Sequence, residues 1–133
     1  VLFMESELMY SVKGEVPDHE YLIPIGQADI KRAGDHVTVI TWGQGVPVSL
    51  KAAELAAADG ISCEVIDLRS IRPLDEAAII QSVKKTNRAV AVYHGWPYGG
   101  VGGELVARIQ DLAFDDLDAP VARVCYEDVP MPY

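Results

Sequence analysis

The sequence predicts an α/β domain built on an open sheet, because strand-like and helix-like stretches alternate along most of the 133 residues. Val65, Ile66 and Leu68 form a short apolar run that is typical of a strand buried on both faces of a parallel sheet. Helix-like sequence lies before this run, at residues 46–59, and after it, at residues 75–87. We therefore expect this strand in the middle of the sheet.

The other expected strands are rich in β-branched or apolar residues. They cover residues 1–3, 21–25, 28–31, 37–42, 89–93 and 121–126. Residues 129–133 contain two prolines and are expected to trail off in an extended conformation.

Three helices are expected between these strands. Gly43 and Gly45 turn the chain into the first, Asp75 is expected to cap the second, and the third covers residues 104–112. Each helix has one apolar face. These faces consist of Val48, Ala52, Leu55 and Ala56 in the first helix, Ala78, Ile79, Ser82 and Val83 in the second, and Leu105, Ile109 and Leu112 in the third.

The chain divides into an arm and a domain. Residues 1–27 lack hydrophobic periodicity over much of their length and are predicted to be a linker or extended arm, whereas residues 28–133 form the domain. Cys63 and Cys125 lie among apolar residues and are expected to be buried free thiols. Both ends are expected to be cuts from a longer polypeptide, because no signal-like pattern opens the chain and it stops just after a predicted strand.

The charge balance limits the partners. The net charge is −9, from 20 acidic and 11 basic side chains, which argues against binding to nucleic acid or to an anionic membrane. It favours a soluble surface or a basic protein partner. No Cys or His spacing typical of zinc is present, and no run of about 18 apolar residues predicts a membrane span.

Gly43 and Gly45, with Asp67 in the next strand, match part of a dinucleotide-binding fingerprint. Val48 stands at the third glycine position, and Pro47 removes an N–H group from the start of the helix. A tight turn from strand to helix is the favoured interpretation, and a nucleotide site is the alternative.

The loop at residues 94–103 combines five glycines with aromatic residues. The glycines suit an anion at the start of the third helix, but a Lys-Ser or Lys-Thr ending is missing. Trp96, Pro97 and Tyr98 suit a protein contact, which is the favoured interpretation. His94, at the end of a predicted strand, has no catalytic partner at a recognisable spacing.

Charged residues elsewhere have structural and functional interpretations. Arg69 and Arg72 are candidates for holding an anion, although pairing with Asp67, Asp75 or another subunit is as plausible. Asp115, Asp116 and Asp118 form an acidic group that is either solvated surface or a patch that steers a basic partner. Because no nucleophile–base pair, metal cluster or pair of carboxylates emerges, no residue is predicted to be catalytic.

Seven stretches together resemble the beta subunit of the decarboxylase component of a 2-oxo acid dehydrogenase, most closely of the pyruvate enzyme. They are FMESELMY (3–10), IPIG (23–26), EVIDLRSIRP (64–73), SVKKTNR (82–88), GWP (95–97), LDAP (117–120) and DVPMPY (128–133).

The resemblance implies a transketolase-type C-terminal domain with three α/β/α layers and a mixed five-stranded sheet whose first strand is antiparallel. It also implies a parent enzyme, an α2β2 heterotetramer with thiamine diphosphate and Mg²⁺, that decarboxylates a 2-oxo acid and acylates a lipoyl group. Its catalytic residues belong to the N-terminal half of the subunit, so the isolated chain is expected to be inactive and to bind no cofactor or metal. A bacterial source implies the cytoplasm, and a eukaryotic one the mitochondrial matrix or a plastid.

The resemblance further implies contacts with the alpha subunit, with the second beta subunit and with the basic peripheral-subunit-binding domain of the acyltransferase. Asp118 matches a docking aspartate of the family, and Asp115 and Asp116 are expected to assist it. Tyr93 and His94 depart from the family, which commonly has glutamate there. The family also continues for about a helix beyond the present end, so an exposed sheet face and an incomplete docking site are expected.

Two further possibilities remain open at this point. One is a free-standing nucleotide- or anion-binding module that uses Gly43, Gly45 and the glycines at 99–103. The other is the equivalent domain of a branched-chain 2-oxo acid or acetoin dehydrogenase.

Overall fold

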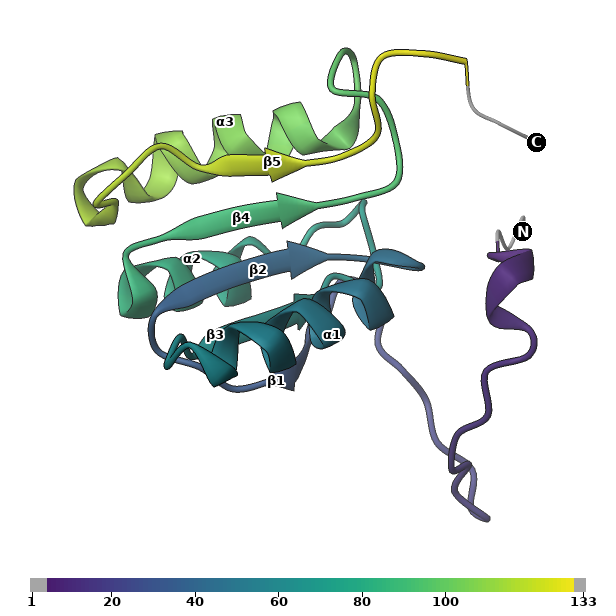
Figure 1. Ribbon diagram of the computed structural model, residues 1–133. Helices are drawn as coiled ribbons and strands as arrows, with labels where there is room; N and C mark the ends of the chain where they lie inside the picture. The colour runs from purple at the N-terminus through teal and green to yellow at the C-terminus, as the bar shows by residue number, and fades with distance from the viewer. Residues whose placement is uncertain (1–4, 131–133) are drawn as a thin grey trace.

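The computed structural model describes residues 5–130, which form a five-stranded sheet flanked by helices (Figure 1). In chain order the elements are η1 (Glu7–Met9), β1 (Asp29–Arg32), β2 (Val37–Thr41), α1 (Gly45–Ala58), β3 (Cys63–Asp67), α2 (Glu76–Thr86), β4 (Ala89–Val92), α3 (Val101–Ala113), η2 (Phe114–Asp116) and β5 (Ala122–Val124).

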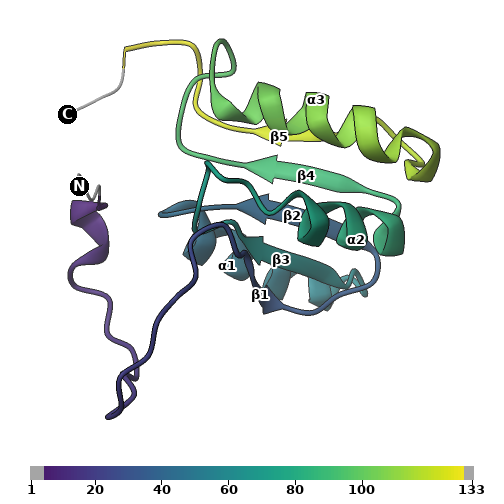
Figure 2. The same ribbon diagram turned by 180° about the vertical axis from the view of Figure 1, so that it is seen from behind.

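The sheet has the order β1-β3-β2-β4-β5. β1 pairs with β3 antiparallel, and all other neighbours are parallel. Helix α1 covers one face, and α2 and α3 cover the other, as the two opposite views show (Figures 1 and 2). The predicted three-layer fold with an antiparallel first strand is confirmed. β3 is interior as expected, but β2 rather than β3 is the middle strand, because the chain reverses direction across the sheet after β3.

The main hydrophobic core lies between the sheet and the helices α2 and α3. Ile40 and Ile66 of the sheet, with Leu105 and Ile109 of α3, are at most 1% exposed. Full burial of each such side chain contributes about 1.5–3 kcal/mol of transfer free energy. Leu68, just after β3, is also fully buried. The apolar residues of the predicted buried strands therefore form the core that holds the sheet and the helices together.

Helix α1 buries a different face from the predicted one. Gly45, Val46, Ser49 and Ala53 face the sheet, while Leu55 of the predicted face is 64% exposed. Nearly every residue of α1 is apolar or small, so apolarity alone does not select a face. The helix instead presents its small residues to the sheet, which allows its backbone to approach closely.

One half of the sheet face beside α1 is open. A shallow groove of about 280 Å³ lies there, and Val90, Val92 and Val124 of β4 and β5 line it together with residues of α1. Val124 on this face is 55% exposed. Cys63 in the same region is buried and Cys125 is partly buried, and both thiols are free, although Cys125 follows β5 rather than lying in it.

Helix α2 is capped at both ends. The Asp75 side chain accepts a hydrogen bond from the Ala78 N–H group at 3.1 Å, which confirms the predicted N-cap. The other carboxylate oxygen accepts from the Ala28 N–H group at 2.9 Å and so ties the start of the domain to α2. Asn87 ends the helix with a positive φ of 59°, a conformation that asparagine adopts more readily than most residues.

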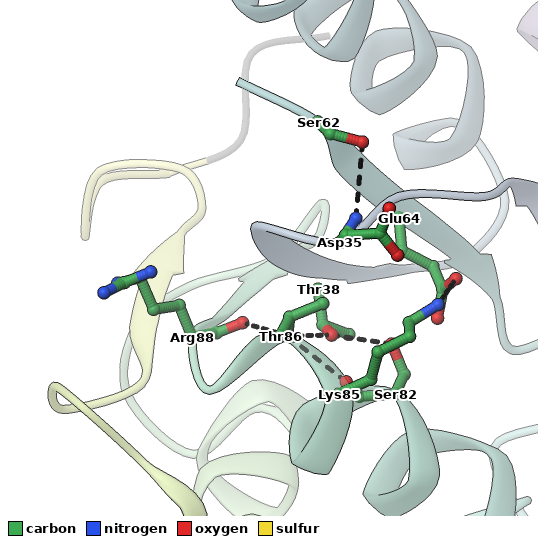
Figure 3. Close-up of polar contacts among 8 residues, drawn as sticks. All are labelled: Asp35, Thr38, Ser62, Glu64, Ser82, Lys85, Thr86 and Arg88. Atoms are coloured by element: carbon green, nitrogen blue, oxygen red, sulfur yellow. Dashed lines mark hydrogen bonds and ion pairs between the residues drawn. The ribbon is translucent and has the colours of Figure 1, made fainter. Parts of the chain in front are cut away.

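A buried polar seam joins α2 to the two central strands (Figure 3). The Thr38 hydroxyl of β2 hydrogen-bonds the Ser82 hydroxyl at 2.6 Å and the Thr86 hydroxyl at 2.7 Å. The Glu64 carboxylate of β3, whose side chain is 3% exposed, pairs with Lys85. The seam satisfies side chains that would otherwise be costly to bury.

Residues 5–27 of the arm do not pair with the sheet. Residues 21–25, predicted to be a strand, are exposed and irregular, and Pro24 and Gly26 (φ 83°) interrupt them. With no sheet edge beside them, their β-branched residues alone do not make a strand. The strand predicted at residues 1–3 lies outside the described residues, as does most of the predicted extended end at 129–133.

We expect Glu64→Gln to lower the free energy of unfolding of the chain by about 1–3 kcal/mol at pH 7, because the Lys85 ammonium group loses its buried partner. Burial opposes ionisation of Glu64, but hydrogen bonds from Lys85 and Ser82, together with the Lys85 charge, lower its pKa below the ordinary 4.5. Its contribution is therefore complete above about pH 4.5 and is lost as the pH falls through the lower folded pKa. Urea denaturation between pH 3 and pH 7 measures this.

Glu54→Gln is the matched control, because Glu54 and its partner Lys51 are both more than half exposed. This change should alter the stability by less than about 0.5 kcal/mol at every pH. Equal effects of the two substitutions would contradict the assignment of the buried pair.

Candidate functional site

The acidic group lies in the connection from α3 to β5, at the edge where the parallel strands begin (Figure 1). Asn87, the C-cap residue of α2, holds this connection in place. Its carbonyl oxygen accepts from the Asp118 N–H group at 2.9 Å, and its side-chain amide donates to the Asp116 carbonyl oxygen at 2.7 Å. The end of α2 therefore fixes the position of the acidic residues.

Two cations at the end of α2 pair with this loop. Arg88 Nη2 lies 2.7 Å from Asp118 Oδ2, and Lys84 Nζ lies 3.6 Å from Asp116 Oδ2. The side chains of Arg88 and Asp118 are each 54% exposed. Within residues 5–130, no ion pair involves Asp115. The three aspartates predicted as a patch thus lie on one short loop, residues 115–118, which we call the acidic loop. They are not equivalent, because only Asp116 and Asp118 form ion pairs within the described part of the chain.

An apolar hollow of about 390 Å³ adjoins Asp118. Its lining consists of Gln110, Phe114, Leu117, Asp118, Ala119 and Pro120. Phe114 is 65% exposed, an unusual position for a large aromatic ring in the absence of a partner. A carboxylate at the rim of an apolar hollow can accept a cation while the hollow receives an apolar side chain.

The aromatic loop lies at the opposite edge of the sheet, where β4 ends (Figure 2). Trp96 Nε1 donates to the Val129 carbonyl oxygen at 2.6 Å, and Arg123 donates to the Pro97 carbonyl oxygen at 2.7 Å. Tyr98 is 89% exposed. The loop is thus held by β5 and by the segment after β5, and it presents the Tyr98 ring outward.

The turn at Gly43–Gly45 serves packing more clearly than ligand binding. The N–H groups of Gly45 and Val46 donate to carbonyl oxygens of Trp42 and Gly43, so they are not free for an anion. A Cβ atom on Gly45 would lie 2.1 Å from Thr41 Oγ1. The interpretation as a tight turn agrees with this geometry.

Gly102 has a comparable packing role at the start of α3. A Cβ atom on it would lie 2.1 Å from Tyr93 Cε1, so the absence of a side chain lets α3 close over the Tyr93 ring. Tyr93 is 3% exposed and stacks on Trp42 with 5.6 Å between ring centroids, and its burial raises the pKa of its hydroxyl. His94 lies against the Tyr126 ring and has no acid–base partner among the described residues.

The candidate anion-binding arginines differ, because Arg69 pairs within the domain whereas Arg72 is exposed and forms no ion pair within residues 5–130. Arg69 donates to Asp29 of β1 at 2.6 Å, a partner that no local sequence pattern indicates, because 40 residues separate the two. The hydrogen bond from Lys31 and the charges of Lys31 and Arg69 lower the pKa of Asp29. The Arg69 guanidinium is therefore occupied within the domain.

Residues 5–130 contain no group of three or more His, Cys, Asp or Glu side chains placed to hold a metal ion. No helix among them is long and apolar enough to cross a membrane.

Residues 26–133 match the family described as "Transketolase, C-terminal domain". The chain belongs to this family. Over its whole length it is 51% identical to the mitochondrial pyruvate dehydrogenase E1 component subunit beta of Rattus norvegicus and 47% identical to that of Dictyostelium discoideum. It is also 47% identical to the pyruvate dehydrogenase E1 component subunit beta of Rickettsia felis. The eukaryotic relatives are named mitochondrial, and the bacterial ones are not.

The chain spans only about two fifths of these relatives, 38% of the rat protein and 41% of the rickettsial one. Among solved structures, an inactive β4 tetramer of a split-gene transketolase aligns over 87% of this chain and 37% of its own, with a TM-score of 0.70 and 24% identity. A 2-oxoglutarate:ferredoxin oxidoreductase aligns over 74% of this chain and 16% of its own, with a TM-score of 0.52 and 14% identity. These two likenesses support the fold alone.

Sequence reasoning did not find the residues that organise the acidic loop. Asn87 and Arg88 lie about 30 residues before Asp118, a separation that no local pattern connects. An asparagine just before a buried strand is a signal for a left-handed helix end, but it does not predict which loop its side chain contacts.

We expect Gly102→Ala to destabilise the chain by about 1–3 kcal/mol, because the new methyl group overlaps the Tyr93 ring. Gly103→Ala is the matched control on the same helix turn. The nearest atom to its new Cβ is 4.0 Å away, so this change should be neutral or stabilising by up to about 1 kcal/mol. Thermal unfolding of the two variants decides the point, and a neutral Gly102→Ala would contradict the close approach of α3 to Tyr93.

Proposed function

We propose that this chain is the C-terminal assembly domain of a pyruvate dehydrogenase beta subunit, and that its acidic loop docks the basic peripheral-subunit-binding domain of the acyltransferase. The whole enzyme decarboxylates pyruvate and acylates lipoyl groups. Residues 1–27 form the interdomain arm, and residues 28–133 the assembly domain. The observation that carries the docking proposal is a half-exposed Asp118 at the rim of an apolar hollow, next to further carboxylates.

The physical case for docking rests on complementarity. A basic domain approaching a chain of net charge −9 is attracted before contact, which raises the association rate. Asp118 and Asp115 then offer carboxylates to its cations, and the exposed Phe114 ring offers apolar area that gains free energy when covered. The arrangement needs no residue with catalytic chemistry.

Trp96, Pro97 and Tyr98 are proposed to contact the second beta subunit or the alpha subunit. Support comes from the 89% exposure of Tyr98 on a loop that other residues hold in place. Aromatic side chains on a fixed loop are efficient anchors, because little conformational entropy is lost when they are buried. The two proposed contact surfaces lie at opposite edges of the sheet, so both can be occupied at once.

In this proposal thiamine diphosphate and Mg²⁺ are held by parts of the heterotetramer outside this chain. They supply the decarboxylation chemistry, and the present residues supply assembly. The domain alone is therefore proposed to have no activity toward pyruvate.

We expect Asp118→Asn, in the assembled decarboxylase, to weaken binding of the isolated acyltransferase docking domain about tenfold, which is ~1.4 kcal/mol. The substitution keeps the shape of the side chain and removes the charge that receives the partner's cation. Titration calorimetry at two salt concentrations measures the change, and the loss should shrink at high salt because exposed charges are screened.

Asp59→Asn is the control. Asp59 is an exposed carboxylate at the end of α1, on the other face of the sheet from α2 and α3 (Figure 2). Removing it changes the net charge equally and should leave the affinity nearly unchanged. If Asp118→Asn binds as tightly as the unaltered enzyme, docking at this loop is wrong.

A further inference from the structure

The ion pair between Arg88 and Asp118 suggests how docking at this loop is controlled. Resting on the proposed function, we propose that Arg88 is an internal competitor of the partner: its guanidinium occupies Asp118 in the free domain, and docking exchanges it for a cation of the basic partner. Arg88 thereby determines how strongly basic a partner must be.

The first observation is that Asp118 does not need Arg88 to be held in position. The Asp118 N–H group donates to the Asn87 carbonyl oxygen at 2.9 Å, and the Asn87 amide holds Asp116 two residues earlier. Both contacts come from the backbone or from an uncharged side chain. The loop therefore keeps its place when the guanidinium leaves.

The second observation concerns the freedom of Arg88. Its main chain is fixed, because its carbonyl oxygen accepts from the Thr38 N–H group at 2.8 Å and lies 3.0 Å from the Thr86 hydroxyl. Its side chain points away from this seam and is half exposed (Figure 3). The guanidinium can swing into water without disturbing the fold.

The third observation is the form of the ion pair. One contact, from Arg88 Nη2 to Asp118 Oδ2 at 2.7 Å, joins two side chains that are each 54% exposed. A single contact in water is weak, so a partner's cation can replace it. While it exists, however, it neutralises the carboxylate nearest to the apolar hollow.

Charge balance gives the consequence. In the unaltered protein, docking replaces the exposed Arg88 pair at Asp118 by a pair with the partner's cation that the interface covers and that is therefore stronger, so only the difference between the two pairs favours docking. Without Arg88, docking adds an ion pair at a free carboxylate. Affinity should therefore rise when Arg88 is neutralised, and it should depend more steeply on salt.

The experiment uses the assembled decarboxylase carrying Arg88→Gln, with the isolated docking domain of the acyltransferase as the probe. We expect about two- to fivefold tighter binding, the range that an exposed ion pair supports. The affinity should also fall more steeply between low and high salt than it does for the unaltered enzyme. Arg88→Lys, which keeps the charge, should behave as the unaltered enzyme.

Lys84→Gln is the matched control, since Lys84 lies one turn earlier on α2 and pairs with Asp116 rather than Asp118. Both substitutions raise the negative charge of the patch, but only Arg88→Gln frees Asp118. In an Asp118→Asn background the gain from Arg88→Gln should disappear, whereas any gain from Lys84→Gln should remain. This double-mutant cycle separates direct exchange from a general charge effect.

Three results would overturn the competitor role. Weaker binding by Arg88→Gln would make Arg88 a positioning residue, unchanged binding would give it no role, and a gain that persists with Asp118→Asn would reduce it to general electrostatics. In each case Asp118→Asn alone still tests the docking proposal. Docking fails separately if that single substitution has no effect.

Discussion

The position of the proposed docking loop depends on the buried seam between α2 and the strands β2 and β3. Thr38 joins Ser82 and Thr86 through hydroxyl groups, and Glu64 joins Lys85 from the neighbouring strand. The seam fixes the rotation of α2 about its axis, because only one helix face carries these polar groups. The seam specifies this one orientation more strictly than apolar packing does, because any other orientation would bury polar groups without hydrogen-bond partners, at a cost in free energy.

The seam also fixes the position of the acidic loop, through the end of α2. Immediately after Thr86, Asn87 turns the chain in a left-handed conformation and holds Asp116 and Asp118 through hydrogen bonds. A fixed helix end thus supports a surface loop that would otherwise be mobile. For a docking surface this matters, because carboxylates that are already in position lose little entropy on binding.

The two edges of the sheet are used differently. At the edge where the parallel strands begin, hydrogen bonds and ion pairs hold charged residues beside the apolar hollow. Such an exposed, charged surface suits a partner that binds reversibly. At the other edge, Arg123 of β5 and the hydrogen bond from Trp96 to Val129 hold the aromatic loop, which suits a lasting contact between subunits. Ligands of open α/β domains usually bind at that second edge, but here packing uses its glycines: Gly45 meets Thr41, and Gly102 meets Tyr93.

By itself the sequence determined the five strands of the sheet, the three helices and the α2 cap, because buried apolar runs, helical spacing and an Asp N-cap are local signals. Only the tertiary structure decided which face of α1 is buried and that residues 21–25 form no strand, since both depend on what lies alongside. It also decided the partners of Asp29, Asp116 and Asp118. A salt bridge forms where the fold brings two charges together. The residues of these pairs are about 30 to 40 positions apart in the sequence, so no local pattern indicates that they pair.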